Sequence, residues 1–278
     1  MKIIAANWKM NHDFDEADNW LDNFLEHYAR QYDFLKNVEM VLCPPTILLD
    51  YIDSELMEDG FQFLEKFADK EGRKIEDFAA EELNEIVLNS RPIKLGGQDC
   101  HFEKSGSFTG DVSASLLKKV GCHYVILGHS ERRAQHFEND EMVAKKVRSA
   151  LAEDLIPIIC VGENKETRDR GEHLEFVRQQ LLKSVPADVI FKKLVIAYEP
   201  IWSIGTGVIP TLEQIAEMIN FIKNTVGKEC FTLYGGSVTS KNSQEILAVA
   251  NVDGLLVGKA SLDSEEFVKI ALSNLVSD

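Results

Sequence analysis

The sequence has few cysteines, and their arrangement argues against two kinds of covalent framework. Only five cysteines occur among 278 residues, they are widely spaced, and no two form a CxxC pair. An odd number of scattered cysteines does not build a disulfide framework, and zinc sites need closely spaced ligands. We therefore expect a reduced, cytoplasmic chain without a structural metal.

Long hydrophobic runs are also missing. The first residues, MKIIAANWKM, carry a short apolar run that Asn7 and Lys9 interrupt, and no later segment approaches the length of a membrane span. Signal peptides and transmembrane helices both need longer runs. The sequence predicts no contact with a membrane interior.

Positive charge is scarce relative to negative charge. The chain has 30 Lys and Arg against 46 Asp and Glu, a formal net charge of -16. A field of that sign repels nucleic acids and anionic membrane surfaces, so neither is expected as a partner. A phosphorylated metabolite remains compatible, because local amides and one lysine can outweigh a screened global field.

What the sequence does contain is a regular alternation of two patterns. Short apolar runs recur along the whole chain, and nearly all lie between segments with helical periodicity. This alternation predicts a parallel sheet with both faces covered. Its number of units favours a single (β/α)8 barrel domain over residues 1–278, although an open doubly wound sheet stays possible. The runs are KIIAAN, VEMVLC, IKLGGQ, YVILGH, PIICVG, LVIAYE, FTLYGG and GLLVG.

The interval between the second and third runs is longer than most of the others. Within it, IEDFAAEELNEIVLN places apolar residues on one helical face, and Ser90 and Pro92 close the segment. We predict an acidic helical insertion over residues 58–91. Because it follows a helix and precedes a strand, it should decorate the bottom face of the barrel, opposite the usual active-site face.

Polar residues that directly follow the strands are the candidates for chemistry, because reactive groups of such barrels project from the C-terminal strand ends. Glu199 could take a proton from carbon if its pocket is dry. His129 opens a helical pattern, and a helix N-terminus would lower its pKa and keep it neutral, able to donate to a carbonyl oxygen. Lys9 supplies a fixed positive charge. Each has an ordinary structural explanation alone, but together they describe an enolisation.

The last two strand ends suit a different task. Ser237 follows two glycines, and Gly258 precedes Lys259. These positions offer backbone amides to a dianion at the place where barrels commonly hold phosphate.

The motifs that contain these residues resemble the triosephosphate isomerase family. They stand in the family's order and cover essentially the whole chain except the insertion: ANWKMN, GSFTGD, VILGHSERR, CVGE, AYEPIWSIGTG, LYGGSV and DGLLVGKASL. The resemblance implies a TIM barrel and a glycolytic and gluconeogenic isomerase. Such an enzyme interconverts D-glyceraldehyde 3-phosphate and dihydroxyacetone phosphate through an enediolate, with no cofactor and no metal. It also implies a homodimer in which Thr109 reaches the partner.

The resemblance further assigns residue roles. Glu199 would move the proton between two carbons and His129 would polarise the carbonyl, while Lys9 and Asn7 would stabilise the enediolate. The phosphate would meet the backbone amides of four residues, Gly205, Ser237, Gly258 and Lys259. A lid and an apolar shield over the base would be formed by Pro200, Trp202, Ile204, Gly207 and Leu256.

Three residues depart from the family pattern. Lys259 stands where a second glycine is usual, and we expect its side chain to point to solvent. Ser203 replaces the usual alanine, a change we expect to be neutral. Pro210 stands where a backbone amide usually bonds to the hydroxyl of Tyr234, and because proline has no amide hydrogen, we expect that latch to be missing.

Two other classes of protein stay open. An aldolase or epimerase would share the phosphate end but needs a Schiff-base lysine in a late strand or a cluster of metal ligands, and neither is apparent. An inactive scaffold or binding protein would be expected to have lost at least one of Lys9, His129 and Glu199, and all three are present.

Overall fold

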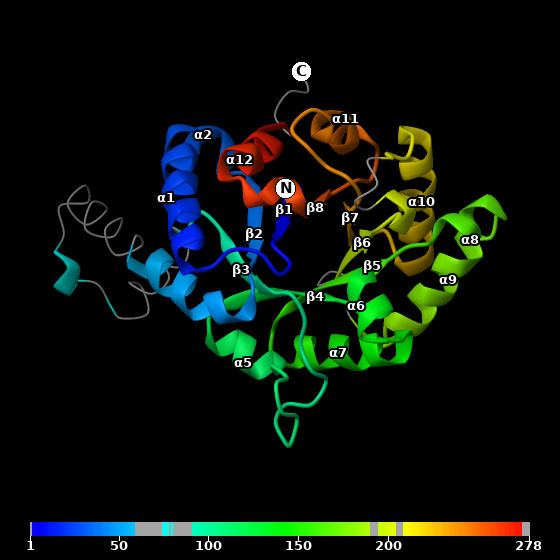
Figure 1. Ribbon diagram of the computed structural model, residues 1–278, viewed down its shortest axis with the longest axis horizontal. Coiled ribbons are helices and arrows are strands. Elements are labelled where there is room, and N and C mark those ends of the chain that lie inside the picture. Colours follow the sequence, from blue (N-terminus) through cyan, green and yellow to red (C-terminus); the bar gives the residue numbers. More distant parts are fainter. Residues whose placement is uncertain are drawn as a thin grey trace.

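The computed structural model describes residues 2–58, 74–77, 79, 91–189, 194–203 and 208–273. Eight parallel strands close into a barrel in chain order (Figure 1). Because the first strand pairs with both the second and the eighth, the predicted closed barrel is confirmed and the open-sheet alternative is wrong. The strands are β1 (Lys2–Asn7), β2 (Val38–Cys43), β3 (Lys94–Gly97), β4 (Cys122–Leu127), β5 (Ile156–Val161), β6 (Val195–Tyr198), β7 (Phe231–Tyr234) and β8 (Gly254–Val257).

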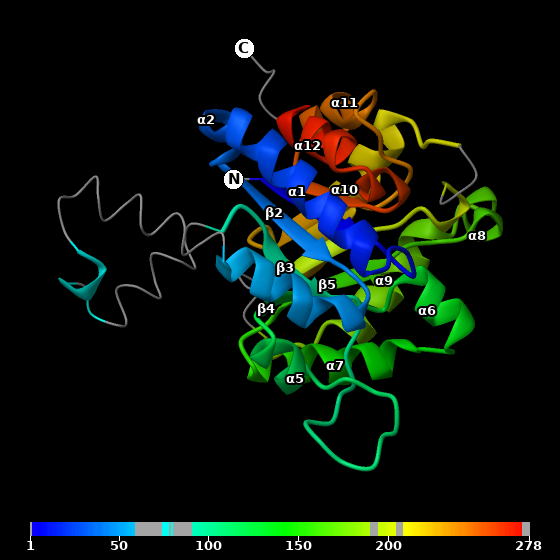
Figure 2. The ribbon, with the colours of Figure 1, turned by 60° about the vertical axis from the view of Figure 1, so that its left-hand side comes forward.

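Helices form a ring outside the barrel, as two views show (Figures 1 and 2). Neighbours in this ring pack together: α1 on α12, α7 on α9, and α9 on α10. The α-helices are α1 (Phe14–Arg30), α2 (Tyr32–Leu35), α5 (Ala114–Lys119), α6 (Ser130–Gln135), α7 (Asp140–Ala152), α8 (Lys165–Asp169), α9 (His173–Ser184), α10 (Leu212–Val226), α11 (Ser243–Ala248) and α12 (Ser264–Leu272). Short 3-10 helices are η1 (Thr46–Leu48), η2 (Ile75–Asp77), η4 (Ile201–Ser203) and η5 (Lys259–Leu262). No helix in the described part of the chain is long and apolar enough to cross a membrane.

The core has two layers because successive residues of a strand point to opposite faces. In β1, Ile3 and Ala5 face the barrel interior, whereas Ile4 and Ala6 face the helices. This double burial is the physical reason for strands that are apolar throughout. The interior layer consists of Ile3, Ala5, Val41, Cys43, Tyr124, Ile126, Ile158, Cys160, Val195, Ala197, Leu233 and Leu256.

Most of the predicted insertion lies outside the described residues. Residues 49–58 are helical, η2 is a short 3-10 turn, and the chain enters the barrel again at β3. The helical insertion over residues 58–91, and its place on the bottom face, therefore stay predictions.

Candidate active site

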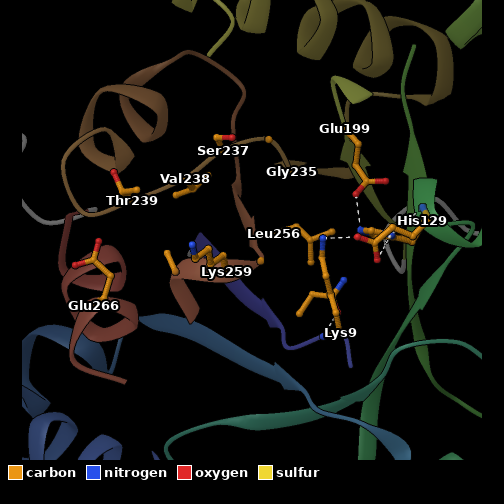
Figure 3. Close-up of a pocket in the computed structure, with 15 residues that line it drawn as sticks. Lys9, His129, Glu199, Gly235, Ser237, Val238, Thr239, Leu256, Lys259 and Glu266 are labelled. Carbon is orange, nitrogen blue, oxygen red and sulfur yellow. Dashed lines mark hydrogen bonds and ion pairs between the residues drawn. The ribbon is translucent and has the colours of Figure 1, made fainter. Parts of the chain in front are cut away.

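A pocket of about 840 Å³ lies at the C-terminal ends of the strands (Figure 3). It collects side chains and backbone from segments that are far apart in the sequence, because parallel strands end on one face of the barrel. Lys9, His129, Glu199, Ser237 and Lys259 all line it, as the strand-end argument predicted. The full lining is Asn7, Lys9, His129, Glu131, Glu199, Gly235, Gly236, Ser237, Val238, Thr239, Leu256, Gly258, Lys259, Ala260 and Glu266.

His129 is the N-cap of α6, and this position determines its tautomer. Its Nδ1 accepts a hydrogen bond from the backbone amide of Glu131 at 3.2 Å. An accepting Nδ1 carries no proton, so the ring proton is on Nε2, which lies 2.8 Å from Oε1 of Glu199. The imidazole in this arrangement is neutral and donates from Nε2, as the proposed electrophile must.

The pKa of His129 differs from the sequence-based expectation. Burial lowers it, but the charge of Glu199 and the hydrogen bond to it raise it, and the net direction is upward. The prediction of a lowered pKa is therefore wrong for this arrangement, because it considered the helix start alone and not a carboxylate from β6. If Glu199 moves away, burial and the nearby Lys9 remain as the lowering influences.

Glu199 follows β6 and is only 2% exposed. Burial alone would raise the pKa of this carboxyl, but His129, the Ser130 amide at 3.0 Å from Oε2, and the charge of Lys9 lower it, and the net direction is downward. A buried carboxylate held ionised by contacts that can break is suited to a base, because losing those contacts leaves burial to raise its basicity.

Lys9 is held in a strained conformation that aims it into the pocket. Its φ is 55°, in the left-handed region that costs energy for a residue other than glycine. The side chain of Asn7 accepts from the Lys9 amide at 3.0 Å, and Gln98 donates to the Lys9 carbonyl at 2.8 Å. Its Nζ lies 2.6 Å from Oε1 of Glu131, so the two side chains form an ion pair.

The other end of the pocket, residues 235–239 and 258–260, is where the sequence predicts a phosphate, and it presents backbone groups. The amides of Ser237, Gly258 and Lys259 donate no backbone hydrogen bond to any described residue. The glycine before Ser237 is required by packing, since a Cβ on Gly236 would lie 2.1 Å from the hydroxyl of Tyr234. The φ of Lys259 is not positive, so a lysine fits there without backbone strain.

The lid residues are only partly described. Pro200 is buried beside Glu199 and Trp202 is half-buried, while Ile204, Gly205 and Gly207 lie outside the described residues. The hydroxyl of Ser203 donates to the carbonyl of Val208 at 2.6 Å. This bond joins the segments before and after residues 204–207, so Ser203 makes a contact that an alanine there would lack.

Two buried or half-buried polar residues that support the site were not among the predicted site residues. Glu163 is fully buried and accepts from the indole of Trp202 at 3.0 Å, so it holds the side chain of a predicted lid residue. Gln98 positions Lys9. Glu163 ends CVGE and Gln98 ends IKLGGQ, so each directly follows an apolar run. Reactive groups of such barrels follow the strands, and these two positions fit that rule as well.

Tyr234 is buried at the end of β7, and Pro210 stands where its latch partner is expected. Burial raises its pKa to about 12, and its hydroxyl is buried without a hydrogen-bond partner of good geometry among the described residues, although it lies near Ser203. Pro210 has no amide hydrogen to donate to this hydroxyl, so the missing latch stays a prediction.

The fold and the site together define a class: a (β/α)8 barrel enzyme that works by proton transfer, with a buried carboxylate and a neutral imidazole at the strand ends. A family model described as "Triosephosphate isomerase" matches residues 2–72 and 76–274. The chain belongs to the triosephosphate isomerase family.

Individual relatives agree with this assignment over almost the whole chain. The chain is 40% identical to triosephosphate isomerase of Ruegeria sp. (strain TM1040), covering 96% of this chain and 95% of the relative. It is 36% identical to that of Aquifex aeolicus (strain VF5), covering 98% and 99%. The crystal structure of triosephosphate isomerase from Bartonella henselae is similar with a TM-score of 0.75 at 33% identity, covering 98% of both chains.

Proposed function

We propose that this chain interconverts D-glyceraldehyde 3-phosphate and dihydroxyacetone phosphate. The observation that carries the proposal is the contact between Glu199 and His129, in which a buried base and a neutral proton donor meet beside Lys9. Enolisation of an α-hydroxy carbonyl requires a base that takes the proton from carbon and a donor that polarises the carbonyl, and both groups line the same pocket.

The reaction begins when the substrate carbonyl replaces the carboxylate as the acceptor for His129. Nε2–H then donates to the carbonyl oxygen, and Glu199 takes a proton from the adjacent carbon, whose electron pair forms the enediolate double bond. The negative charge that develops on oxygen is stabilised by the ammonium of Lys9 and the amide of Asn7. Nε2 of His129 gives its proton to the former carbonyl oxygen and takes the hydroxyl proton from the oxygen on the carbon that was deprotonated, while Glu199 returns its proton to the neighbouring carbon. One proton has then moved between the carbons and one between the oxygens, so no oxidant or reductant is needed.

Separation of Glu199 from His129 also adjusts the acidity of both groups. The carboxyl loses the interactions that lower its pKa, while burial continues to raise it. Leu256, which is buried and lines the pocket, keeps part of this space apolar. Glu199 therefore becomes a stronger base at the moment when it faces the carbon.

The phosphate of the substrate is assigned to the other end of the pocket. The amides of Ser237, Gly258 and Lys259 point to a dianion site there, and Gly205 would add another amide from the lid. Pro200, Trp202, Ile204 and Gly207 would form the lid itself.

The protein is also proposed to be a homodimer. Four apolar side chains are exposed on successive loops that follow β1 to β4, at one rim of the barrel: Met10, Ile47, Phe108 and Phe137. Burying them against a second copy, with Thr109 in the contact, would remove a large apolar surface from water. Sedimentation equilibrium at micromolar concentration tests this: a dimer mass supports the proposal, and a monomer mass overturns it.

Two further proposals concern the cellular compartment of the enzyme and the kind of partner it binds. All five cysteines are buried and free of disulfides, which supports a reducing compartment such as the cytoplasm. The net charge of -16 supports a small-molecule partner rather than nucleic acid or membrane.

The deciding experiment is an isomerase assay of the purified protein in both directions, without added metal, beside Glu199→Gln. Fast turnover that collapses in the variant supports the reaction and the base together. A folded protein with no turnover contradicts the proposal and favours the inactive-scaffold alternative.

A further inference from the structure

Lys259 is the lining residue that the proposed mechanism uses only through its backbone. It follows β8 as the first residue of η5, its side chain is exposed, and it lines the pocket. Figure 3 shows this side chain among the lining residues, in view between Lys9 and Glu266. The side chain of Lys259 is thus exposed to solvent and is also part of the pocket lining.

If Lys259 is left out, the side chains that line the pocket carry more negative than positive charge. Three carboxylates line the pocket, those of Glu131, Glu199 and Glu266, whereas Lys9 is the one lining lysine besides Lys259. Lys9 already lies 2.6 Å from Glu131, so its charge is largely compensated. A dianionic substrate entering such a pocket would be repelled unless another cation were present.

The ammonium group of Lys259 is a positive charge at the pocket that no carboxylate of the described residues compensates. Within the described residues, its ammonium forms no ion pair, whereas Glu266 is engaged at 2.7 Å by the amide of Ser240. A Cβ on Gly258, the residue before Lys259, would lie 3.8 Å from Nζ of Lys9, so the Lys9 ammonium lies close to the backbone at the start of η5. The free amides of Ser237 and Lys259 belong to the same pocket.

We propose that the side chain of Lys259 is a second cation of the phosphate site, which strengthens binding of the phosphate dianion and thereby selects phosphorylated substrates. The inference rests on the proposed function and extends it from the backbone of this residue to its ammonium group. Because the contact is partly exposed, its contribution decreases as salt screens it.

The test measures the affinity for inorganic phosphate by isothermal titration at low and high ionic strength. Lys259→Met removes the charge at similar length, and Lys259→Arg keeps it. Lys241→Met removes an exposed lysine that lies between β7 and α11 and does not line the pocket. We expect Lys259→Met to weaken phosphate binding about fivefold at low salt, with a smaller change at high salt. The Arg variant and Lys241→Met should each stay within about twofold of the parent protein.

Kinetics separate this role from a structural one. Lys259→Met should raise the KM for triose phosphate with little change in kcat, because the cation meets the phosphate equally before and during the reaction. Equal phosphate affinity in Lys259→Met and the parent would overturn the inference, even if the parent is an active isomerase. Weakened phosphate binding in a protein without isomerase activity would instead support the cation and contradict the proposed function.

Discussion

The two ends of the pocket are built in different ways. At the reaction end, Glu199 and His129 are buried, contact each other and have shifted pKa values. At the phosphate end, glycine-rich turns present backbone amides, and the charged side chain of Lys259 is exposed.

The difference follows from what each end must do. Proton transfer depends on the pKa of the groups involved, and burial and neighbouring charges are the means by which a fold sets a pKa. A phosphate dianion is already charged and needs only well-placed donors, which the backbone supplies without any titration. Side-chain identity should therefore matter most at the reaction end, and backbone shape at the phosphate end.

The largest expected effect is that of Glu199→Gln. An amide cannot take the proton, so kcat should fall on the order of 10³-fold or more, while the affinity for inorganic phosphate stays unchanged. Steady-state kinetics and phosphate titration on the same sample give both values. A parallel loss of phosphate affinity would show that the two ends are not separate.

His129→Gln is expected to lower kcat by about 10²- to 10³-fold, because a donor to the developing oxyanion is weakened. It should also move the acid limb of the pH profile. His129 helps to lower the pKa of Glu199, so in the variant the base becomes protonated at a higher pH. Activity should then be lost earlier as the pH falls, and kcat/KM against pH measures this; a limb that stays in place would contradict the assigned coupling.

Gly236→Ala tests the role of backbone shape at the phosphate end. Its new Cβ would lie 2.1 Å from the Tyr234 hydroxyl, so the turn must shift, at about 1–3 kcal/mol of stability and with a higher KM. Gly171→Ala is a control outside the pocket, where a Cβ meets nothing within 4 Å but φ is 73°. The control should lose some stability through this strain while KM stays constant, and an unchanged KM in Gly236→Ala would refute the argument.

The smallest effect is expected for Tyr234→Phe. Because the hydroxyl has no well-formed hydrogen bond among the described residues, kcat should change less than about twofold, and stability should not fall. Tyr198→Phe is the matched control, since its hydroxyl donates to Glu163 at 3.1 Å and its loss should cost about 1 kcal/mol. Chemical denaturation measures the stability of both variants, and steady-state kinetics measure their kcat. A large drop in kcat for Tyr234→Phe would show that a lid latch exists.

Much of this architecture was predictable because it depends on local patterns. The apolar runs predicted the strands, and the closed barrel confirms them. Gln98 and Glu163 also follow apolar runs, so their positions at strand ends were predictable, but a single polar residue after a strand does not reveal what it contacts. Their roles arise from Lys9 and Trp202, which lie far away along the chain.

The sequence by itself determined the barrel, through the repeated alternation of apolar runs and amphipathic segments, and it placed Lys9, His129 and Glu199 at strand ends. Only the tertiary structure decided how these groups affect one another. The upward pKa shift of His129 and the downward shift of Glu199 depend on a 2.8 Å contact between the ends of β4 and β6. Electrostatic interactions of that kind depend on distance and burial, which no linear pattern of residues records.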